Sequence, residues 1–254
     1  MAEKPERWRR AWVIGASSGI GRETALKLAP LCGEVIVSAR SAGRLQELER
    51  MADNITSIPL DVTDAASVKT AAKKVGVGSN CPDLVLISSG LWKQVRLPGL
   101  DPADFRASMD VNFNGVIEVL SAVLPPMADR QSGHVAIFAS VAGYRGLPNS
   151  AAYSPTKAAL INLAESIKPQ LDAMGVTISL VNPGFVDTPM TSVNRFPMPF
   201  LMEPEEAALI IVDGLQRRKY EIAFPMRLAW PLKFTRAIPN AVYFWLVRKL
   251  VLRK

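Results

Sequence analysis

The chain has 254 residues, of which 49% are hydrophobic, and a formal net charge of +7. Its length suits one large domain or two small ones, and because no Gly/Ser-rich or charged linker divides it, we expect one. Two cysteines, Cys32 and Cys81, and a single histidine supply neither a disulfide framework nor a metal-ligand cluster, so we expect no metal site and a reducing cytoplasm.

The ends of the chain differ in charge. The first ten residues start too acidic, and the apolar run after them is too short, for a signal peptide. No run of about 18 apolar residues is present, so the sequence predicts no membrane-spanning helix. Residues 217–254 contain ten basic residues and one acid, a net charge of +9, which leaves −2 for the rest of a chain whose total is +7. The excess positive charge therefore lies in the C-terminal segment, and it bears on what that segment binds and not on the fold of the body.

A strand, a glycine turn and a helix open the chain. An apolar run over 11–14 is followed by Gly15-Ala16-Ser17-Ser18-Gly19-Ile20-Gly21 and by a helical pattern through Leu28. Gly15 permits a tight turn, Gly19 lets backbone approach a pyrophosphate, and Gly21 lets the helix pack closely on the strand. We expect a phosphate site at this helix N-terminus, although the GxxxGxG spacing alone also fits an ordinary glycine turn.

The second predicted strand, residues 34–40, ends in Ala39 and Arg40. An NAD site is expected to place an acidic residue there, where it binds the ribose hydroxyls. Without the acid there is no repulsion of a 2′-phosphate, and Arg40 can pair with one, with Arg22 as a second partner. The sequence therefore favours NADP(H) over NAD(H); the alternative is that Arg40 is an ordinary surface arginine.

Strands and helices continue to alternate: a helix over 45–51, a strand over 55–60, a helix over 65–75 and a buried strand over 83–87. Asp64 is expected to cap the third helix. Asp61 is expected to accept a hydrogen bond from an adenine amino group, and Ser88-Ser89-Gly90 to lie along a cofactor ribose.

A long helix is predicted over 102–127, and the first interpretation of Asn112 inside it is structural. The strand over 133–140 ends in Ser140, at the edge where open α/β sheets bind ligands. His134 begins this strand without a second ligand or an acidic partner, so we expect no catalytic role for it.

Tyr153 and Lys157 lie four residues apart on one face of a helix predicted over 151–174. An ammonium beside a phenol favours the phenolate and lowers its pKa, so the pair can exchange a proton with an alcohol or ketone. The spacing alone more often marks a solvated helix face. Pro155 is tolerable in the first turn, whereas Pro169 is expected to kink the helix.

After a strand over 176–181 comes Asn182-Pro183-Gly184, and residues 190–202 contain two prolines and much apolar surface. This segment is either a substrate lid or a plain irregular loop. A helix over 203–216 and a strand over 220–224 follow. The alternation predicts an α/β fold with one doubly wound, seven-stranded parallel sheet and right-handed crossovers.

Together these motifs resemble the short-chain dehydrogenase/reductase family over about residues 10–225. The resemblance rests on Gly15-x-x-x-Gly19-Ile20-Gly21, Asp61-Val62, Asn112, Ser140, Tyr153-x-x-x-Lys157 and Pro183-Gly184. It implies a single-domain Rossmann fold over 1–225 and hydride transfer between a nicotinamide and a carbonyl or secondary alcohol. Ala39-Arg40 is similar to NADP(H)-preferring members. A homodimer or homotetramer built on the helices from Pro102 and Ala151 is also implied.

The resemblance assigns roles as well. Tyr153 would donate the proton in reduction, Lys157 would bind the nicotinamide ribose and lower the pKa of the tyrosine, and Ser140 would hold the carbonyl oxygen. Asn112 would hold a water in a relay to Lys157. These four residues form the expected catalytic set. The expected cofactor-binding set is Gly15, Ser17, Ser18, Gly19, Ile20, Gly21, Arg22, Arg40, Asp61, Val62, Ser89, Gly90, Tyr153, Lys157, Pro183, Gly184, Val186 and Thr188, the last two holding the carboxamide.

The sequence departs from the family pattern after the fourth strand, where Ile87-Ser88-Ser89-Gly90 replaces the usual Asn-Asn-Ala-Gly. Gly90 still allows close approach of a ribose. The missing asparagines would remove side-chain hydrogen bonds that brace the sheet, so we expect this segment to be less firmly held.

Residues 226–254 form a basic aromatic C-terminal extension. The apolar stretch 241–247 is too short to span a bilayer, but aromatic residues mixed with lysine and arginine suit the plane of a membrane interface. Association with the inner face of a membrane is one interpretation; a terminal helix packed on the body or on a sister subunit is the other. No nucleic-acid motif is present, so we expect no nucleic-acid partner.

We therefore expect an oxidoreductase that uses NADP(H) and acts on an apolar or lipid-like ketone, such as a 3-oxoacyl chain or a 3-ketosphinganine-type lipid. Two alternatives are a non-catalytic NADP(H)-sensing protein and a peripheral membrane scaffold. The intact set of Asn112, Ser140, Tyr153 and Lys157 argues against a sensor, which needs no proton relay.

Overall fold

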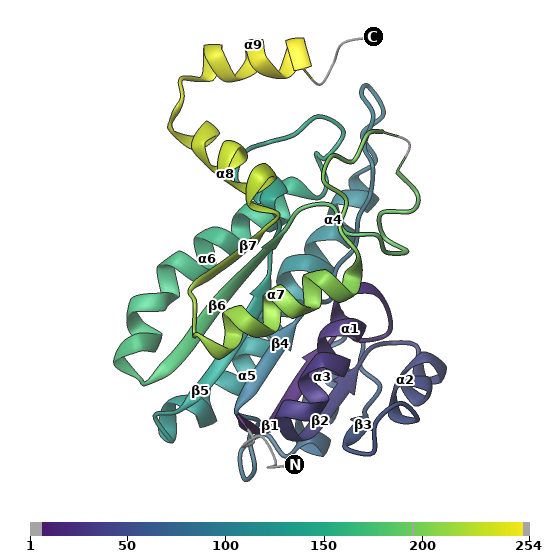
Figure 1. Cartoon of the computed structure of the whole chain (residues 1–254), viewed down its shortest axis with the longest axis vertical. Coiled ribbons are helices and arrows are strands. Elements are labelled where there is room, and N and C mark those ends of the chain that lie inside the picture. The colour runs from purple at the N-terminus through teal and green to yellow at the C-terminus, as the bar shows by residue number, and fades with distance from the viewer. Residues whose placement is uncertain (1–6, 195, 251–254) are drawn as a thin grey trace.

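The computed structural model describes residues 7–194 and 196–250 (Figure 1), so most of the acidic N-terminal stretch and the last four residues of the C-terminal extension lie outside the described residues. Seven strands form one sheet in the order β3-β2-β1-β4-β5-β6-β7, and every neighbouring pair is parallel. They are β1 (Trp8–Ile14), β2 (Cys32–Ser38), β3 (Ile55–Ser57), β4 (Leu84–Ile87), β5 (Gly133–Phe138), β6 (Val176–Pro183) and β7 (Glu221–Phe224). The expected seven-stranded parallel sheet is confirmed.

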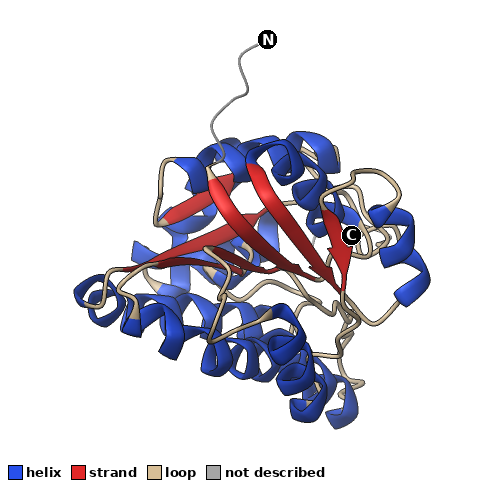
Figure 2. Cartoon of the chain, turned by 90° about the horizontal axis from the view of Figure 1, so that it is seen from below, coloured by secondary structure: helices blue, strands red, loops and turns tan. Residues whose placement is uncertain are grey.

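Helices cover both faces of the sheet (Figure 2). One buried cluster joins the sheet to α3 (Ala65–Val75), α5 (Gly115–Asp129) and α6 (Ser154–Ala173). The other joins it to α1 (Gly19–Leu28), α2 (Ala42–Glu49) and α7 (Pro204–Gln216). The remaining helices are α4 (Pro102–Met109), α8 (Met226–Phe234) and α9 (Asn240–Leu250). The fold is therefore doubly wound, as predicted.

The strands are apolar because both faces of the sheet are covered. All four residues of β4 are fully buried, and so are Ala11, Trp12 and Val13 in β1. Such strands read as continuous apolar runs and not as alternating ones. The buried Trp12 indole donates its N–H to the Ser38 hydroxyl at 2.9 Å, so its polar atom is satisfied inside the core.

The helix predicted over 102–127 is interrupted. A π-helical turn over Asp110–Asn114 separates α4 from α5. The whole stretch, Pro102–Asp129, is long and apolar enough to cross a membrane by length and composition. The sequence prediction of no such helix considered only uninterrupted apolar runs, and polar residues interrupt this stretch. Val116, Val119 and Val123 are nevertheless buried in the sheet's core cluster, as in the core helix of a globular domain.

Other element boundaries differ modestly from those expected. Strand β3 ends at Ser57, three residues early, and α2 begins at Ala42, three residues before the predicted start. Helix α6 continues past Pro169 to Ala173. The Asp64 carboxylate caps α3 as expected, accepting from the Ala66 N–H.

Candidate active site

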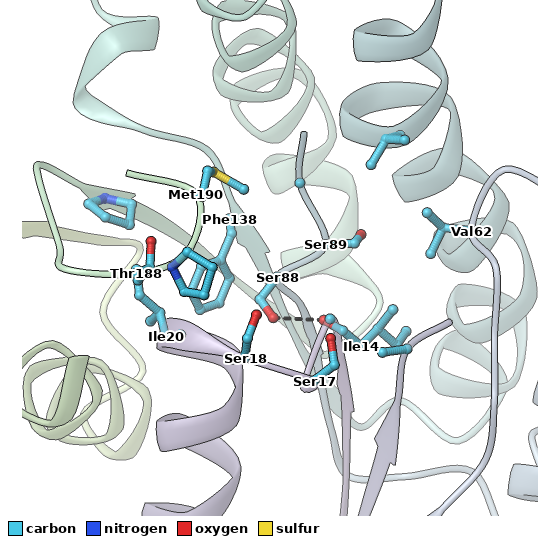
Figure 3. Close-up of a pocket in the computed structure, with 18 of the residues that line it drawn as sticks. Ile14, Ser17, Ser18, Ile20, Val62, Ser88, Ser89, Phe138, Thr188 and Met190 are labelled. Atoms are coloured by element: carbon cyan, nitrogen blue, oxygen red, sulfur yellow. Dashed lines mark hydrogen bonds between the residues drawn. The ribbon is translucent and has the colours of Figure 1, made fainter. Parts of the chain in front are cut away.

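A cavity of about 610 Å³ lies at the carboxyl edge of the sheet (Figure 3). It lies at the switch point between β1 and β4. From β1 the following strands are added on one side of the sheet, and from β4 they are added on the other. Doubly wound sheets bind ligands at this point. Seventeen of the eighteen expected cofactor residues line it, together with Ser140. The two expected site residues outside this lining are Arg22 and Asn112.

The glycine turn fits its expected purpose. Gly15 and Gly19 have φ values of +88° and +55°, which L side chains rarely adopt. A Cβ at Gly15 would lie 2.5 Å from the Ser89 backbone nitrogen, and a Cβ at Gly19 would lie 2.9 Å from Thr188 Cγ2. Ser18, the N-cap of α1, lines the cavity, and its side chain accepts no hydrogen bond from the backbone N–H groups of the first helical turn. These features suit a pyrophosphate.

Two arginines line the end of the cavity beyond β2. Arg40 is joined there by Arg44, which sequence analysis missed because the helix was expected to begin only at Leu45. The available signal was a second arginine in the short segment directly after Arg40. Arg22 is directed elsewhere: its guanidinium pairs with Glu23 and approaches Met51 Sδ at 3.1 Å. The structure therefore offers Arg44, and not Arg22, as the second cation of this site.

Asp61 also lines this part of the cavity. Its Oδ1 accepts from the Thr63 backbone N–H at 2.9 Å and from the Thr63 hydroxyl at 2.7 Å. The backbone hydrogen bond from Thr63, helped by the nearby Arg40 charge, holds the pKa of Asp61 below its usual range despite partial burial. The carboxylate is thus ionised at neutral pH, with Oδ2 left to accept a further hydrogen bond.

The serines after β4 partly replace the expected asparagine brace. The Ser88 hydroxyl donates to the Ile14 carbonyl at 2.7 Å and so ties β4 to β1 (Figure 3). The neighbouring Ser89 hydroxyl is buried, lines the cavity and has no partner among the described residues. An unpartnered buried hydroxyl at this position is consistent with a polar ligand group binding beside it.

Ser140, Tyr153 and Lys157 converge on the same cavity. Ser140 follows β5, and its hydroxyl donates to the Pro183 carbonyl at 3.3 Å and accepts from the Ala142 N–H at 3.1 Å. Tyr153 is the N-cap of α6, and its phenol interacts with the Ser140 hydroxyl. Lys157, 3% exposed, lies one turn later and donates from Nζ to the Phe138 carbonyl at 2.7 Å.

The charge states of this group differ from those expected. Burial raises the pKa of Tyr153 to about 12, and the hydrogen bond with Ser140 only partly opposes it. Burial lowers the pKa of Lys157 to about 7. The expected lowering of the tyrosine pKa is therefore wrong for this structure. The lysine Nζ lies 5.5 Å from the centre of the Tyr153 ring and binds a backbone carbonyl, so desolvation outweighs its charge.

Asn112 lies behind the site and not in it. From the π-helical turn, its side chain accepts from the Leu91 N–H at 2.6 Å and donates to the Leu91 carbonyl at 2.9 Å and to the Thr156 hydroxyl at 3.0 Å. These bonds hold the segment after β4 against the start of α6. The structural interpretation accounts for its side chain, and the water-relay role stays a prediction.

Trp92 is a site residue that sequence analysis missed. Its ring packs edge-on against Tyr153, with centroids 5.2 Å apart, and its Nε1 donates to Asn194 Oδ1 at 2.9 Å. It therefore connects Tyr153 to the segment over 190–202. No feature of the sequence marked it, because this contact joins residues about a hundred positions apart.

That segment closes one side of the cavity. Met190 lines the cavity beside Thr188 (Figure 3). The base of the segment is fixed, because Asp187 N–H donates to the Met202 carbonyl at 2.9 Å and Met202 N–H to the Phe185 carbonyl at 3.1 Å. Phe200 and Leu201 remain 49% and 45% exposed. The segment has the position and apolar character of a lid.

His134 lies at the opposite end of β5 from Ser140. It is buried beside Ser179, and burial lowers its pKa to about 4. It is therefore distant from the cavity and neutral at physiological pH. Among the residues that the structure describes, no group of three or more His, Cys, Asp or Glu side chains could hold a metal ion.

Comparisons with known proteins agree with this geometry. The family model described as "short chain dehydrogenase" matches residues 9–197. An uncharacterised oxidoreductase of Myxococcus xanthus is 37% identical over 247 residues, covering 96% of this chain and 98% of its own. One from Staphylococcus saprophyticus is 31% identical over 212 residues, covering 82% and 91%.

Solved structures are similar as well. A short-chain dehydrogenase from Streptomyces avermitilis superposes with a TM-score of 0.81 over 94% of this chain and 96% of its own, at 24% identity, which supports the fold. A second structure, described as a short chain dehydrogenase/reductase family protein, has a TM-score of 0.75 at 26% identity and covers 84% of this chain and 93% of its own.

Proposed function

Because the chain belongs to the short-chain dehydrogenase family, we propose that this NAD(P)-dependent oxidoreductase transfers a hydride between NADP(H) and an apolar ketone or the corresponding secondary alcohol. The observation that supports this most is the convergence of Tyr153, Ser140 and Lys157 on the cavity that the glycine turn also lines. A proton-exchanging phenol and a phosphate-binding turn would then act on a substrate and a cofactor bound in the same cavity.

The residues present fit such a cofactor. When bound, the nicotinamide supplies or accepts the hydride. The glycine turn would hold the pyrophosphate, and Lys157 would donate to the nicotinamide ribose. Val186 and Thr188, which line the cavity, would hold the carboxamide. The unpartnered Ser89 hydroxyl and the turn's lack of room for a Cβ support this fit.

Preference for NADP(H) over NAD(H) is proposed from charge. Arg40 and Arg44 line one end of the cavity, and β2 ends at Ser38, followed by Ala39, without an acidic residue. Arginine recognises phosphate through charge-assisted hydrogen bonds. Both arginines would face the 2′-phosphate, which NAD(H) lacks.

In the reductive direction, the Tyr153 hydroxyl donates its proton to the carbonyl oxygen as that oxygen gains negative charge. The Ser140 hydroxyl donates to the same oxygen and orients it. A charged Lys157 stabilises the phenolate that remains. The high pKa of Tyr153 keeps the proton on the phenol at neutral pH, so the free enzyme is ready to act as the acid.

An apolar substrate is proposed because the walls beside Tyr153 are apolar. Trp92 packs on the tyrosine, Met190 lines the cavity, and Phe185 packs on Phe196 of the lid with ring centroids 6.0 Å apart. A 3-oxoacyl chain or a 3-ketosphinganine-type lipid combines a ketone with a long apolar part that these walls would accommodate.

The proposal includes a cytoplasmic location and a homodimer or homotetramer built on α4, α5 and α6. Met109 and Ile117 are exposed on this helical face, 38% and 36%, which supports its use as a contact between copies. Association with the inner face of a membrane through the C-terminal helices is the further part of the proposed location.

The test is NADPH oxidation against methyl ketones of graded chain length, repeated with NADH. We expect kcat/KM to rise with each added methylene that the cavity buries, by roughly fourfold at about 0.8 kcal/mol each, and to be higher with NADPH. A rate that does not depend on chain length contradicts the apolar substrate, and preference for NADH contradicts the cofactor assignment. NADPH binding without oxidation by any ketone would instead favour the NADP(H)-sensing protein.

A further inference from the structure

The exposed aromatic side chains gather at one edge of the molecule. The segments that leave the carboxyl edge of the parallel sheet include 90–101 after β4, 188–203 in the connection from β6 to α7, and 225–250 after β7. Within the described part of the chain, the large aromatic side chains that are exposed all lie on the last two: Phe200, Trp230, Phe234, Phe244 and Trp245. Figure 1 shows α8 and α9 extending beyond the strand ends, at the same end of the molecule as the lid. We call these five side chains the aromatic edge.

Helix α8 separates its apolar residues by side. Ala229 is buried, and Leu228 packs so closely on the backbone at Gly184 that a Cβ there would lie 2.9 Å from Leu228 Cδ2. On the other side Met226, Trp230 and Phe234 recur every four residues and are 52%, 65% and 68% exposed. Spacing of four places them in one stripe along the helix, so the exposed stripe is continuous.

Helix α9 is held in place by its other face. Tyr243 is 4% exposed, its hydroxyl donates to the Gly146 carbonyl, and the Arg145 guanidinium lies 4.5 Å from its ring centre. Phe244 and Trp245, by contrast, are 55% and 52% exposed. A helix anchored through one aromatic residue therefore presents the next two to solvent.

Basic residues surround the aromatic edge. Residues 226–250 include five lysines and arginines and no acidic residue. Lys233 and Arg236 pair with Glu221 and Glu165 of the body. The other three, Arg227, Arg248 and Lys249, form no ion pair with the described residues, and Lys249 Nζ lies 4.9 Å from the Trp245 ring centre. Their charges are free to meet an external anion.

We propose that the aromatic edge, with Arg227, Arg248 and Lys249, binds the surface of an anionic lipid bilayer. Aromatic rings settle at the headgroup level, and each nearby lysine or arginine adds attraction to anionic lipid. A second copy of the chain is a poorer partner. A symmetric contact between two copies would bring together two basic surfaces that contain no acidic residue, and these would repel each other.

This orientation also turns the lid and the mouth of the cavity toward the bilayer, since both lie at the same edge as α8. An apolar ketone could then enter from the lipid phase without crossing water. This consequence rests on the proposed reductase activity, whereas the membrane binding itself does not.

The test is sedimentation of the full-length protein with vesicles of phosphatidylglycerol or of phosphatidylcholine, at low and at high salt. We expect binding to phosphatidylglycerol at low salt, weakened by salt and much weaker on phosphatidylcholine. The double variants Trp230→Ser/Phe234→Ser and Arg248→Glu/Lys249→Glu should each lower the affinity for phosphatidylglycerol by about tenfold or more.

Matched controls change the same chemistry elsewhere. Leu209→Ser removes a side chain that is 57% exposed on α7, and Lys69→Glu/Lys73→Glu reverses two exposed charges on α3. Both should leave the vesicle affinity within about twofold, because neither site is part of the aromatic edge or of its three unpaired basic residues. Circular dichroism of each variant reports whether it folds.

Absence of binding to phosphatidylglycerol at low salt overturns the proposal, as does equal loss in the control variants. If Trp230→Ser/Phe234→Ser instead dissociates an oligomer in sedimentation velocity and leaves vesicle binding unchanged, the surface covers a second copy and the proposal is wrong. Oxidation of NADPH by a water-soluble ketone without vesicles tests the reductase independently, so failure of one proposal is distinguishable from failure of the other.

Discussion

The charge of Lys157 depends strongly on its surroundings. It is buried, it has no carboxylate partner among the described residues, and its Nζ donates to the Phe138 carbonyl. Desolvation disfavours the ammonium, which brings the pKa to about 7 from an ordinary value near 10.5. The lysine can thus change charge within the working range of the enzyme, although the tyrosine beside it does not.

This shift predicts a pH dependence. The value of kcat/KM for NADPH reports the protonation of the free enzyme. Below pH 7 the ammonium is present to bind ribose and stabilise the phenolate; as pH rises through about 7 it is lost, so kcat/KM should fall. Lys157→Arg retains a charge over this range, and its residual activity should not fall near pH 7. A profile of the wild-type enzyme that is flat up to pH 9.5 would contradict a functional role for this charge.

Arg40 gives a second prediction at the residue scale. Arg40→Asp removes a cation from the expected 2′-phosphate site and adds a carboxylate. Loss of a charge-assisted hydrogen bond costs about 1.5–3 kcal/mol, so the KM for NADPH should rise at least about tenfold while use of NADH improves. Arg22→Ala is the matched control, because Arg22 pairs with Glu23 and does not line the cavity. A larger rise in KM for Arg22→Ala than for Arg40→Asp would show that the wrong arginine has been assigned.

At the scale of elements, Glu221 joins the C-terminal helices to the site. On the edge strand β7, its carboxylate accepts from the Tyr144 hydroxyl at 2.7 Å, from Asn182 Nδ2 at 2.9 Å and from Lys233 of α8. Tyr144 follows Ser140 by four residues, and Asn182 precedes the Pro183 carbonyl that Ser140 binds. One carboxylate thus connects α8 to two segments near Ser140: the turn that follows Ser140 in the chain, and the end of β6 to which Ser140 is hydrogen-bonded.

Glu221→Gln should therefore lower the free energy of unfolding by about 1–3 kcal/mol, measured by urea denaturation. Burial opposes ionisation of Glu221, but its hydrogen bonds, with Lys233 foremost, lower its pKa below 4.5. A lowered pKa means that the stabilisation is present above about pH 4.5 and is lost as pH falls below it, so the difference between variant and wild type should shrink in acid.

The control for this prediction is Glu165→Gln, which removes an exposed pair with Arg236 at 3.6 Å. Exposed pairs contribute about 0–1 kcal/mol, so the effect should be small. Equal effects of the two substitutions would mean that Glu221 is an ordinary surface carboxylate.

The regular elements and most of the cavity lining were predictable because hydrophobic periodicity reports burial. Residues at strand ends, such as Ser140 after β5 and Gly90 after β4, then meet at one edge in any parallel sheet. What the sequence did not reveal depends on contacts between distant segments. The π-helical turn at Asn112 comes with bonds to Leu91 and Thr156, and Trp92 joins the lid to Tyr153. The direction of the Tyr153 pKa shift was also predicted wrongly, because the spacing of Tyr153 and Lys157 on a helix does not show how deeply the phenol is buried.

At the scale of the whole molecule, the sheet places three functions at one edge. In the proposed function, the glycine turn after β1 and the arginines after β2 would bind the cofactor. The residues after β5 and at the start of α6 would bind the carbonyl, and the segments after β6 and β7 would provide the apolar surroundings. A single cavity connects the first two sets, and α8 packs directly behind it at Gly184. The proposed chemistry, substrate class and location thus all rest on one arrangement of strand ends.

The most direct test of this account is the Tyr153→Phe variant, which removes one hydroxyl and retains the ring that packs on Trp92. NADPH oxidation by a responsive ketone should fall roughly 100-fold or more, the usual contribution of a general acid, while the NADPH dissociation constant from fluorescence titration stays close to that of the wild-type protein. Turnover near the wild-type rate, with NADPH still bound, would contradict the central claim that this phenol transfers the proton.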